Sequence, residues 1–187
     1  MKKLFITLCI SLISACLSAQ SISLVKSIDN AKVVVEADKI VGNDYMYGYA
    51  EVGKDIVPYI QLIYERTLWK SLGLHTEFRT DFYQNYYFIG PVWSFMFDDG
   101  AIMVEPLCRY ENRQVYWQGS VVWSFDKKWY DFYGYADIWG QTSAPMFYSE
   151  FRWHAKLNQH IGLGVIANVM YFDKFDFVPN ISLRYNF

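Results

Sequence analysis

The chain has 187 residues, which is enough for one domain with a sizeable core. Aromatic residues make up 20% of it and charged residues only 19%, a balance typical of a wall that faces lipid on one side. The formal net charge of −2 excludes the basic surface that a nucleic-acid partner requires, so we expect no nucleic acid to bind.

The first 19 residues have the pattern of a secretory signal peptide. Two lysines precede an apolar segment, residues 4–17, and cleavage is predicted between Ala19 and Gln20. This segment is too short for a comfortable transmembrane helix. A second interpretation stays open, in which residues 13–16 are a lipoprotein signal and Cys16 is acylated.

The remaining chain, residues 20–187, is predicted to be one β domain because apolar and polar residues alternate with a period of two. Turn residues interrupt this alternation at regular intervals. We predict about twelve strands, at 21–28, 31–40, 45–54, 58–67, 71–81, 86–97, 101–111, 115–125, 129–139, 146–157, 160–171 and 177–187. The first two are the weakest, and ten strands is the alternative.

The last predicted strand has the clearest alternation. Its apolar face includes Ile181, Leu183, Tyr185 and Phe187, and the chain stops on that aromatic residue. Such an ending resembles the closing strand of an outer-membrane β-barrel, whose strands alternate between lipid and lumen. We expect these four residues to form the signal that the barrel-assembly machinery reads.

The predicted fold class is therefore all-β, a single antiparallel transmembrane β-barrel in the outer membrane of a Gram-negative-type envelope. A strand of about ten residues, tilted by roughly 40°, crosses the apolar band of about 25 Å in such barrels. The connections are short, so no plug domain is expected. A soluble lipocalin-like barrel or β-sandwich is the competing interpretation. The signal segment, the aromatic content and the C-terminal phenylalanine together favour the membrane barrel.

Counting back from the C-terminus assigns ionisable and aromatic residues to the interior face. Both signs of charge occur, which favours a neutral polar solute over a strongly charged one. Acid–base pairs inside a small barrel also neutralise one another as structural networks, and this alternative stays open for each residue. The candidate lumen residues are His75, Glu77, Arg79, Glu105, Arg109, Tyr133, Tyr135, Asp137, Glu150, Arg152, His154, Asn168 and Arg184.

Catalysis and cofactor binding are not indicated by the sequence. The chain has three histidines; His154 shares its face with Glu150, which is roughly 13 Å away along a strand and too far for a dyad, and His160 lies at a turn. No Gly-x-Ser-x-Gly element and no metal-binding spacing is present, so we predict no enzyme, no metal and no cofactor. An enzyme would need His75 or His154 to bond to an acid beside a lipid-accessible cleft.

Several motifs of the second half resemble one known family. They are the aromatic-rich segment 133–140, the arginine-bearing segment 148–153, and the segments 162–165, 168–175 and 179–187. Over residues 115–187 the chain resembles the nucleoside-specific channels of the Tsx-like superfamily, especially a shorter uncharacterised branch. The N-terminal half is similar only in strand count. The resemblance implies a monomeric twelve-stranded barrel with a narrow pore and nucleoside sites lined by aromatic and ionisable residues.

The sequence thus predicts a porin-like outer-membrane channel or binding barrel for small polar solutes, with nucleosides as the candidates that the resemblance adds. Outer-membrane lipid, the solute and the barrel-assembly machinery are the expected partners, and we expect a monomer. The alternative is a closed barrel with a structural or docking role, sealed by pairs such as Glu105 with Arg109. A membrane-embedded lipid enzyme is the third class.

Overall fold

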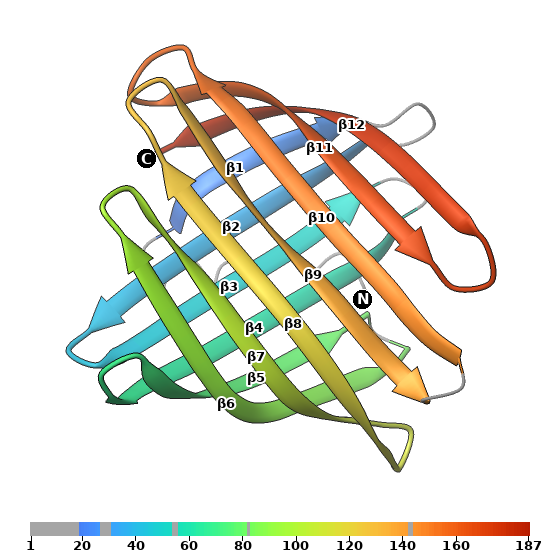
Figure 1. The fold of residues 1–187 in the computed structure, drawn as a ribbon. Helices are drawn as coiled ribbons and strands as arrows, with labels where there is room; N and C mark the ends of the chain where they lie inside the picture. The colour runs from blue at the N-terminus through green and yellow to red at the C-terminus, as the bar shows by residue number, and fades with distance from the viewer. Residues whose placement is uncertain (1–18, 27–30, 54–55, 82, 142–143) are drawn as a thin grey trace.

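The computed structural model describes residues 19–26, 31–53, 56–81, 83–141 and 144–187, which form twelve antiparallel strands closed into one barrel (Figure 1). Each strand pairs with its sequence neighbours, and the first strand closes the ring on the last. The strands are β1 (Ala19–Lys26), β2 (Ala31–Val41), β3 (Asp44–Gly53), β4 (Ile56–Trp69), β5 (Leu72–Thr80), β6 (Asn85–Phe97), β7 (Gly100–Glu111), β8 (Gln114–Asp126), β9 (Tyr130–Gln141), β10 (Ala144–Lys156), β11 (Ile161–Tyr171) and β12 (Phe175–Asn186).

The prediction of a twelve-stranded antiparallel barrel is confirmed, and the ten-strand alternative is wrong. Both N-terminal strands take part in the ring, because Ser23 of β1 faces Val34 of β2 on one side and Arg184 of β12 on the other. Closure leaves no sheet edge, so every strand has two hydrogen-bonding neighbours. Residues 1–18, which hold most of the predicted signal peptide and Cys16, lie outside the described residues, and Ala19 is the first residue of β1.

The two faces of the wall differ sharply in exposure. On β12, Ile181 and Leu183 are 62% and 46% exposed, whereas Asn180 and Ser182 between and beside them are 7% and 0% exposed. The closed ring turns the polar face inward and the apolar face outward. The inside of the barrel is therefore filled by polar side chains, and the outer surface is apolar.

Exposed aromatic rings mark both rims of the barrel. Trp69, Trp129 and the C-terminal Phe187 lie at the end that carries the β4–β5 and β8–β9 turns, and each is at least 65% exposed. Tyr171 and Phe175 occupy the opposite rim. Girdles of this kind are what transmembrane barrels place at the two membrane interfaces.

The connections between strands are short. Glu111 and Gln114 pair directly, so only two residues, Asn112 and Arg113, make the β7–β8 turn. Both have positive φ angles, 47° and 64°, as a tight hairpin turn of the primed type requires. Among the described residues, no helix is long and apolar enough to cross a membrane.

Candidate functional site in the barrel interior

The inward face of the wall carries a dense set of polar and charged side chains. Within the described residues, the buried members include His75, Glu77, Glu105, Gln118, Asp131, Asp137, Glu150, Arg152, His154, Asn180 and Ser182. Every candidate predicted from the sequence lies on this inward face or contacts it. Burying so many ionisable groups is costly unless each is paired, and the structure groups them into separate clusters.

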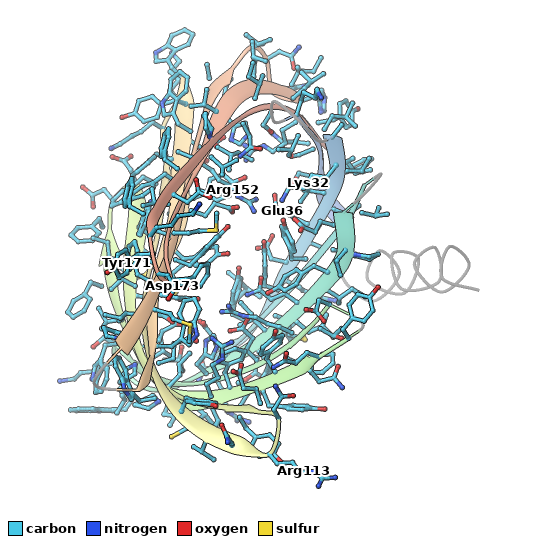
Figure 2. All side chains as sticks on the ribbon, turned by 90° about the vertical axis from the view of Figure 1, so that its right-hand side faces the viewer. Lys32, Glu36, Arg113, Arg152, Tyr171 and Asp173 are labelled. Carbon is cyan, nitrogen blue, oxygen red and sulfur yellow. The ribbon has the colours of Figure 1, made fainter. Side chains whose placement is uncertain are left out.

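One cluster bridges the barrel from wall to wall. Arg152 of β10 donates from Nε to Glu150 Oε1 and from Nη1 to Glu36 Oε1 of β2, both at 2.5 Å. Figure 2 shows the Arg152 and Glu36 side chains pointing toward one another across the interior. Tyr47 donates its hydroxyl to Glu36 at 2.9 Å. One guanidinium thus binds two carboxylates from strands far apart in the ring.

A second bridge joins β5 to β9. Arg79 donates to Glu77 on its own strand and, from Nη1, to Asp137 Oδ2 at 3.2 Å. Its guanidinium also lies 4.5 Å from the centre of the Phe88 ring. The side chains of Glu77 and Asp137 are at most 4% exposed, so this arginine neutralises two buried carboxylates.

Arg109 belongs to a different group from the one the sequence suggested. It donates from Nε to Glu111 at 2.7 Å and from Nη1 to Gln118 at 3.4 Å, and its guanidinium lies 4.9 Å from the Trp139 ring centre. The pair of Glu105 with Arg109, which the sequence offered as an example for the closed-barrel alternative, is not among the ion pairs of the described residues. The two lie four residues apart on β7, about 13 Å along an extended strand.

His75 on β5 stands among three glutamates. Its Nδ1 lies 2.9 Å from Glu65 Oε1 of β4 and 3.5 Å from Glu105 Oε1 of β7, and its Nε2 lies 3.3 Å from Glu77 Oε2. His75 is 1% exposed and Glu105 is 3% exposed. We call these four residues the His75 cluster.

His154 on β10 occupies a similar setting with different neighbours. Its Nδ1 lies 3.3 Å from Asp131 Oδ1 of β9, and its Nε2 lies 3.1 Å from Ser182 Oγ of β12. Arg184 donates from Nη2 to Asp131 and from Nη1 to the Tyr133 hydroxyl, the latter at 3.1 Å. We call these five residues the His154 cluster.

The Ser182–His154–Asp131 series has the order of a serine-hydrolase relay, but its surroundings do not suit a nucleophile. Ser182 and His154 are both 0% exposed, so a substrate carbonyl has no route to the Oγ atom. Both histidines that lie beside an acid face the barrel interior rather than a lipid-accessible cleft. The expectation that the protein is not an enzyme stays a prediction.

The aromatic candidates differ in how their ring faces are used. Tyr133 stacks on His154 at 5.9 Å between ring centres, and the guanidinium groups of Arg152 and Arg184 lie 5.4 and 5.5 Å from its own centre. The Tyr133 ring therefore already contacts three neighbouring side chains. Tyr135 has its ring centre 5.6 Å from that of Tyr148.

Asn168 remains among the candidates because its Oδ1 is buried without a hydrogen-bond partner in the described residues.

The sequence-based list missed the contribution of β2, β3 and β4. Glu36 and Tyr47 belong to the Arg152 bridge, Glu65 belongs to the His75 cluster, and Glu51 pairs with Lys32. The alternation of tyrosines from Tyr45 to Tyr49 is the signal that identifies this inward face.

Including these strands changes the charge balance of the interior. In the described chain, the inward carboxylates outnumber the inward lysines and arginines. The carboxylates are Glu36, Glu51, Glu65, Glu77, Glu105, Glu111, Asp131, Asp137 and Glu150. The basic groups are Lys32, Arg79, Arg109, Arg152, Lys156 and Arg184.

A groove of about 720 Å³ lies along strands β3 to β8. Its lining includes Met46, Leu62, Phe78 and Tyr87, which alternate with the inward residues of their strands. It is thus a feature of the apolar outer wall, where a membrane barrel contacts lipid. It is not part of the polar interior.

Comparison with solved structures finds barrels of the same architecture. The KdgM porin has 10% sequence identity and a TM-score of 0.59, covering 90% of this chain and 99% of that chain. The same porin in complex with disordered oligogalacturonate gives the same values. The NanC porin has 6% identity and a TM-score of 0.62, covering 90% of this chain and 98% of that chain.

No protein-family model matches the chain. No curated protein matches it either. The Tsx-like resemblance therefore stays a prediction. The identities to the solved porins are low, and the likeness concerns the fold alone: this chain has the same closed twelve-stranded antiparallel barrel fold as the KdgM and NanC porins.

Proposed function

We propose that the protein is an outer-membrane channel for small polar solutes that are neutral or positively charged. The observation that carries this proposal is the contrast between the two faces of one closed wall. The outer face is apolar with aromatic rims, which suits a bilayer, and the inner face is charged and tyrosine-rich, which suits a hydrated path.

The excess of carboxylates supports the charge preference. A ring of acidic side chains attracts cations and repels anions at close range. Oligogalacturonate, the solute in one KdgM structure, is an anion, whereas the interior of this chain is acidic overall and its described arginines are paired with carboxylates. We therefore do not extend that solute to this protein. Nucleosides are neutral at physiological pH and remain within the proposed class.

Stacking of a solute ring is proposed for Tyr135 rather than for Tyr133. The Tyr133 ring already contacts His154 and two arginines, whereas Tyr135 contacts the ring of Tyr148. A nucleobase or another flat polar ring gains stacking energy only on a ring face that is available to it. Tyr135 and Tyr148 thus make the better platform.

A closed barrel is the second candidate, and the Arg152 bridge favours it. Its hydrogen bonds to Glu36 and Glu150 join opposite parts of the wall at one height. A bridge that persists in solution narrows the passage at that height. In that case the barrel has a structural or docking role, which is the alternative given in the sequence analysis.

Planar-bilayer recordings of the purified full chain test the proposal. We expect discrete channel openings, with block by a nucleoside or a neutral sugar and none by oligogalacturonate.

Glu36→Gln removes one carboxylate of the Arg152 bridge and leaves Glu150 to pair with the arginine, so we expect a larger conductance if the bridge narrows the path. Lys127→Ala, at the exposed Lys127–Asp99 pair of a turn, is the matched control and should leave the conductance unchanged. A wild-type protein that folds and inserts but never conducts would support the closed barrel.

A further inference from the structure

We propose that Glu65, His75 and Glu105 bind one divalent metal ion of the zinc class inside the barrel. The three residues come from β4, β5 and β7, and each offers one donor atom, with all three atoms within 4.8 Å of one another. All three residues face the interior, and His75 and Glu105 are at most 3% exposed. This inference does not depend on the proposed transport function.

The strand register explains how residues from three strands meet. His75 lies directly opposite Glu65 in the β4–β5 pairing and directly opposite Gly90 in the β5–β6 pairing. The residue of β7 beyond Gly90 is Leu107, and Glu105 lies two residues further along β7 on the same inward face. The β6–β7 pairing is interrupted from Gly90 to Val92, where Pro91 removes a backbone donor. His75 therefore reaches Glu105 diagonally, across a strand segment that has a glycine opposite the histidine.

Two of the three distances between donor atoms match those expected around one metal ion, and the third, between the two carboxylate oxygens, is at most 4.8 Å. Metal–ligand bonds of about 2.0–2.2 Å place neighbouring ligand atoms roughly 3.0 Å apart in octahedral and roughly 3.4 Å apart in tetrahedral geometry. The His75 Nδ1 atom lies 2.9 Å from Glu65 Oε1 and 3.5 Å from Glu105 Oε1. A cation among these three atoms therefore needs only small side-chain adjustments.

The second observation is an unsatisfied buried oxygen. Glu105 Oε1 is buried without a hydrogen-bond partner in the described residues, and His75 Nδ1 lies 3.5 Å from it. A buried carboxylate oxygen without a donor is costly unless a cation balances it. In the described residues no lysine or arginine forms an ion pair with Glu65 or Glu105, whereas Arg79 pairs with Glu77 and Asp137.

Glu77 supplies the support that a metal-binding histidine normally has. The other ring nitrogen of His75, Nε2, lies 3.3 Å from Glu77 Oε2. A carboxylate in that position holds the proton on Nε2 and leaves the Nδ1 lone pair for a metal. With the ring in that tautomer, Nδ1 and two carboxylate oxygens point toward one place and repel one another. A cation at that place would bind all three and remove the repulsion.

The donor set selects the class of metal. One imidazole and two carboxylates are typical ligands of Zn²⁺, which keeps three protein ligands in sites with an open fourth position. Ca²⁺ takes six to eight oxygen ligands, and Mg²⁺ retains most of its waters. Within the described residues, the His154 cluster offers no equivalent set, because Ser182 stands where Glu105 stands and Arg184 already neutralises Asp131.

Zinc binding by the tag-free, full-length folded protein in detergent tests the proposal. Titration with ZnCl₂ by calorimetry, followed by metal analysis after gel filtration, should give one bound zinc per chain. The wild type needs no substitution for this result, so a failure to bind zinc saturably overturns the proposal. X-ray absorption of the zinc-loaded protein should show nitrogen and oxygen ligands with one imidazole; any other donor set also overturns it.

Substitution of each of the three histidines in turn identifies the one that binds zinc. His75→Gln and Glu105→Gln should abolish the binding, and Glu77→Gln should weaken it about 10–100-fold, as loss of a supporting carboxylate does at other sites. His154→Gln, an equally buried histidine, and His160→Gln, an exposed one, should bind zinc as the wild type does. Equal loss in His75→Gln and His154→Gln would place the zinc elsewhere and contradict the assignment.

Discussion

The His75 and His154 clusters are built on the same plan but differ in charge. Each histidine faces an acid on the preceding strand, Glu65 or Asp131, and a glycine on the following strand, Gly90 or Gly164. Each also lies beside a residue two strands away, Glu105 in one case and Ser182 in the other. In the His154 cluster Gly164 pairs with His154 on one side and with Ser182 on the other, so no side chain separates these two partners. In the His75 cluster the residue beyond Gly90 is Leu107, and Glu105 lies two residues further along β7.

The net charge of each cluster depends on the residue two strands away, Glu105 or Ser182, and on the presence of an arginine partner. In the His154 cluster, Arg184 pairs with Asp131, and the serine adds no charge. In the His75 cluster, two of the three glutamates have no arginine partner in the described residues. In the first arrangement an arginine offsets the charge of the acid, and Asp131 Oδ1, His154 Nδ1 and Arg184 Nε are still without a hydrogen-bond partner in the described residues. In the second arrangement no arginine offsets two of the acids, so their charge needs a proton or a metal ion. Two clusters with the same backbone plan are thus expected to respond differently to the same changes.

The largest effect is expected from Arg184→Gln. This change leaves Asp131, whose side chain is 9% exposed, without its basic partner, and removing one member of a buried pair costs about 3 kcal/mol or more. Urea unfolding in lipid vesicles, followed by the fluorescence of the seven tryptophans, measures the loss. A free energy of unfolding equal to that of the wild type would show that the His154 cluster is not balanced by this arginine.

The next effect tests the glycine of the shared plan. A methyl group at Gly164 would lie 2.0 Å from the Trp153 carbonyl oxygen and 2.7 Å from His154 Cδ2, so Gly164→Ala should destabilise the barrel by about 1–3 kcal/mol. Gly162→Ala, on the same inward face, is the matched control. Its methyl group would be 3.5 Å from His154 Cβ, an ordinary contact. Equal unfolding midpoints for the two variants would contradict the role given to Gly164.

The smallest effect is expected from Glu105→Gln in the presence of a chelator. This change removes one negative charge from the His75 cluster and leaves Glu65 and Glu77 beside the histidine, so the free energy of unfolding should stay within about 1 kcal/mol of the wild-type value. Added zinc should then stabilise the wild type and not the variant, because only a ligand that binds the folded state raises its stability. A loss as large as that of Arg184→Gln would mean that Glu105 is held by a structural pair and not by a cation.

The strands and the two faces of the wall were predictable from local patterns. Every predicted strand overlaps one that forms, because a period of two sorts side chains whatever the neighbouring strand is. The same pattern assigned His75, His154 and Arg184 to the interior. This pattern assigns residues to a face correctly because it depends only on residues that are adjacent in the sequence.

The clusters were not predictable, because they depend on the register between strands and on closure of the ring. Glu65 and His75 are ten residues apart, but Arg152 and Glu36 are 116 residues apart and meet only across the closed barrel. Period two gives the face of a residue and not its height on the wall. For the same reason Glu105 was paired with Arg109, its neighbour on the strand, rather than with His75.

Ion selectivity in a planar bilayer tests the central claim most directly, since that claim is a hydrated path with an acidic wall. With a KCl gradient across the membrane, the account predicts a reversal potential that favours K⁺ over Cl⁻, because the inward carboxylates outnumber the inward basic groups. A reversal potential that favours Cl⁻ would contradict the assigned interior, and a folded, inserted protein with no conductance would contradict the channel.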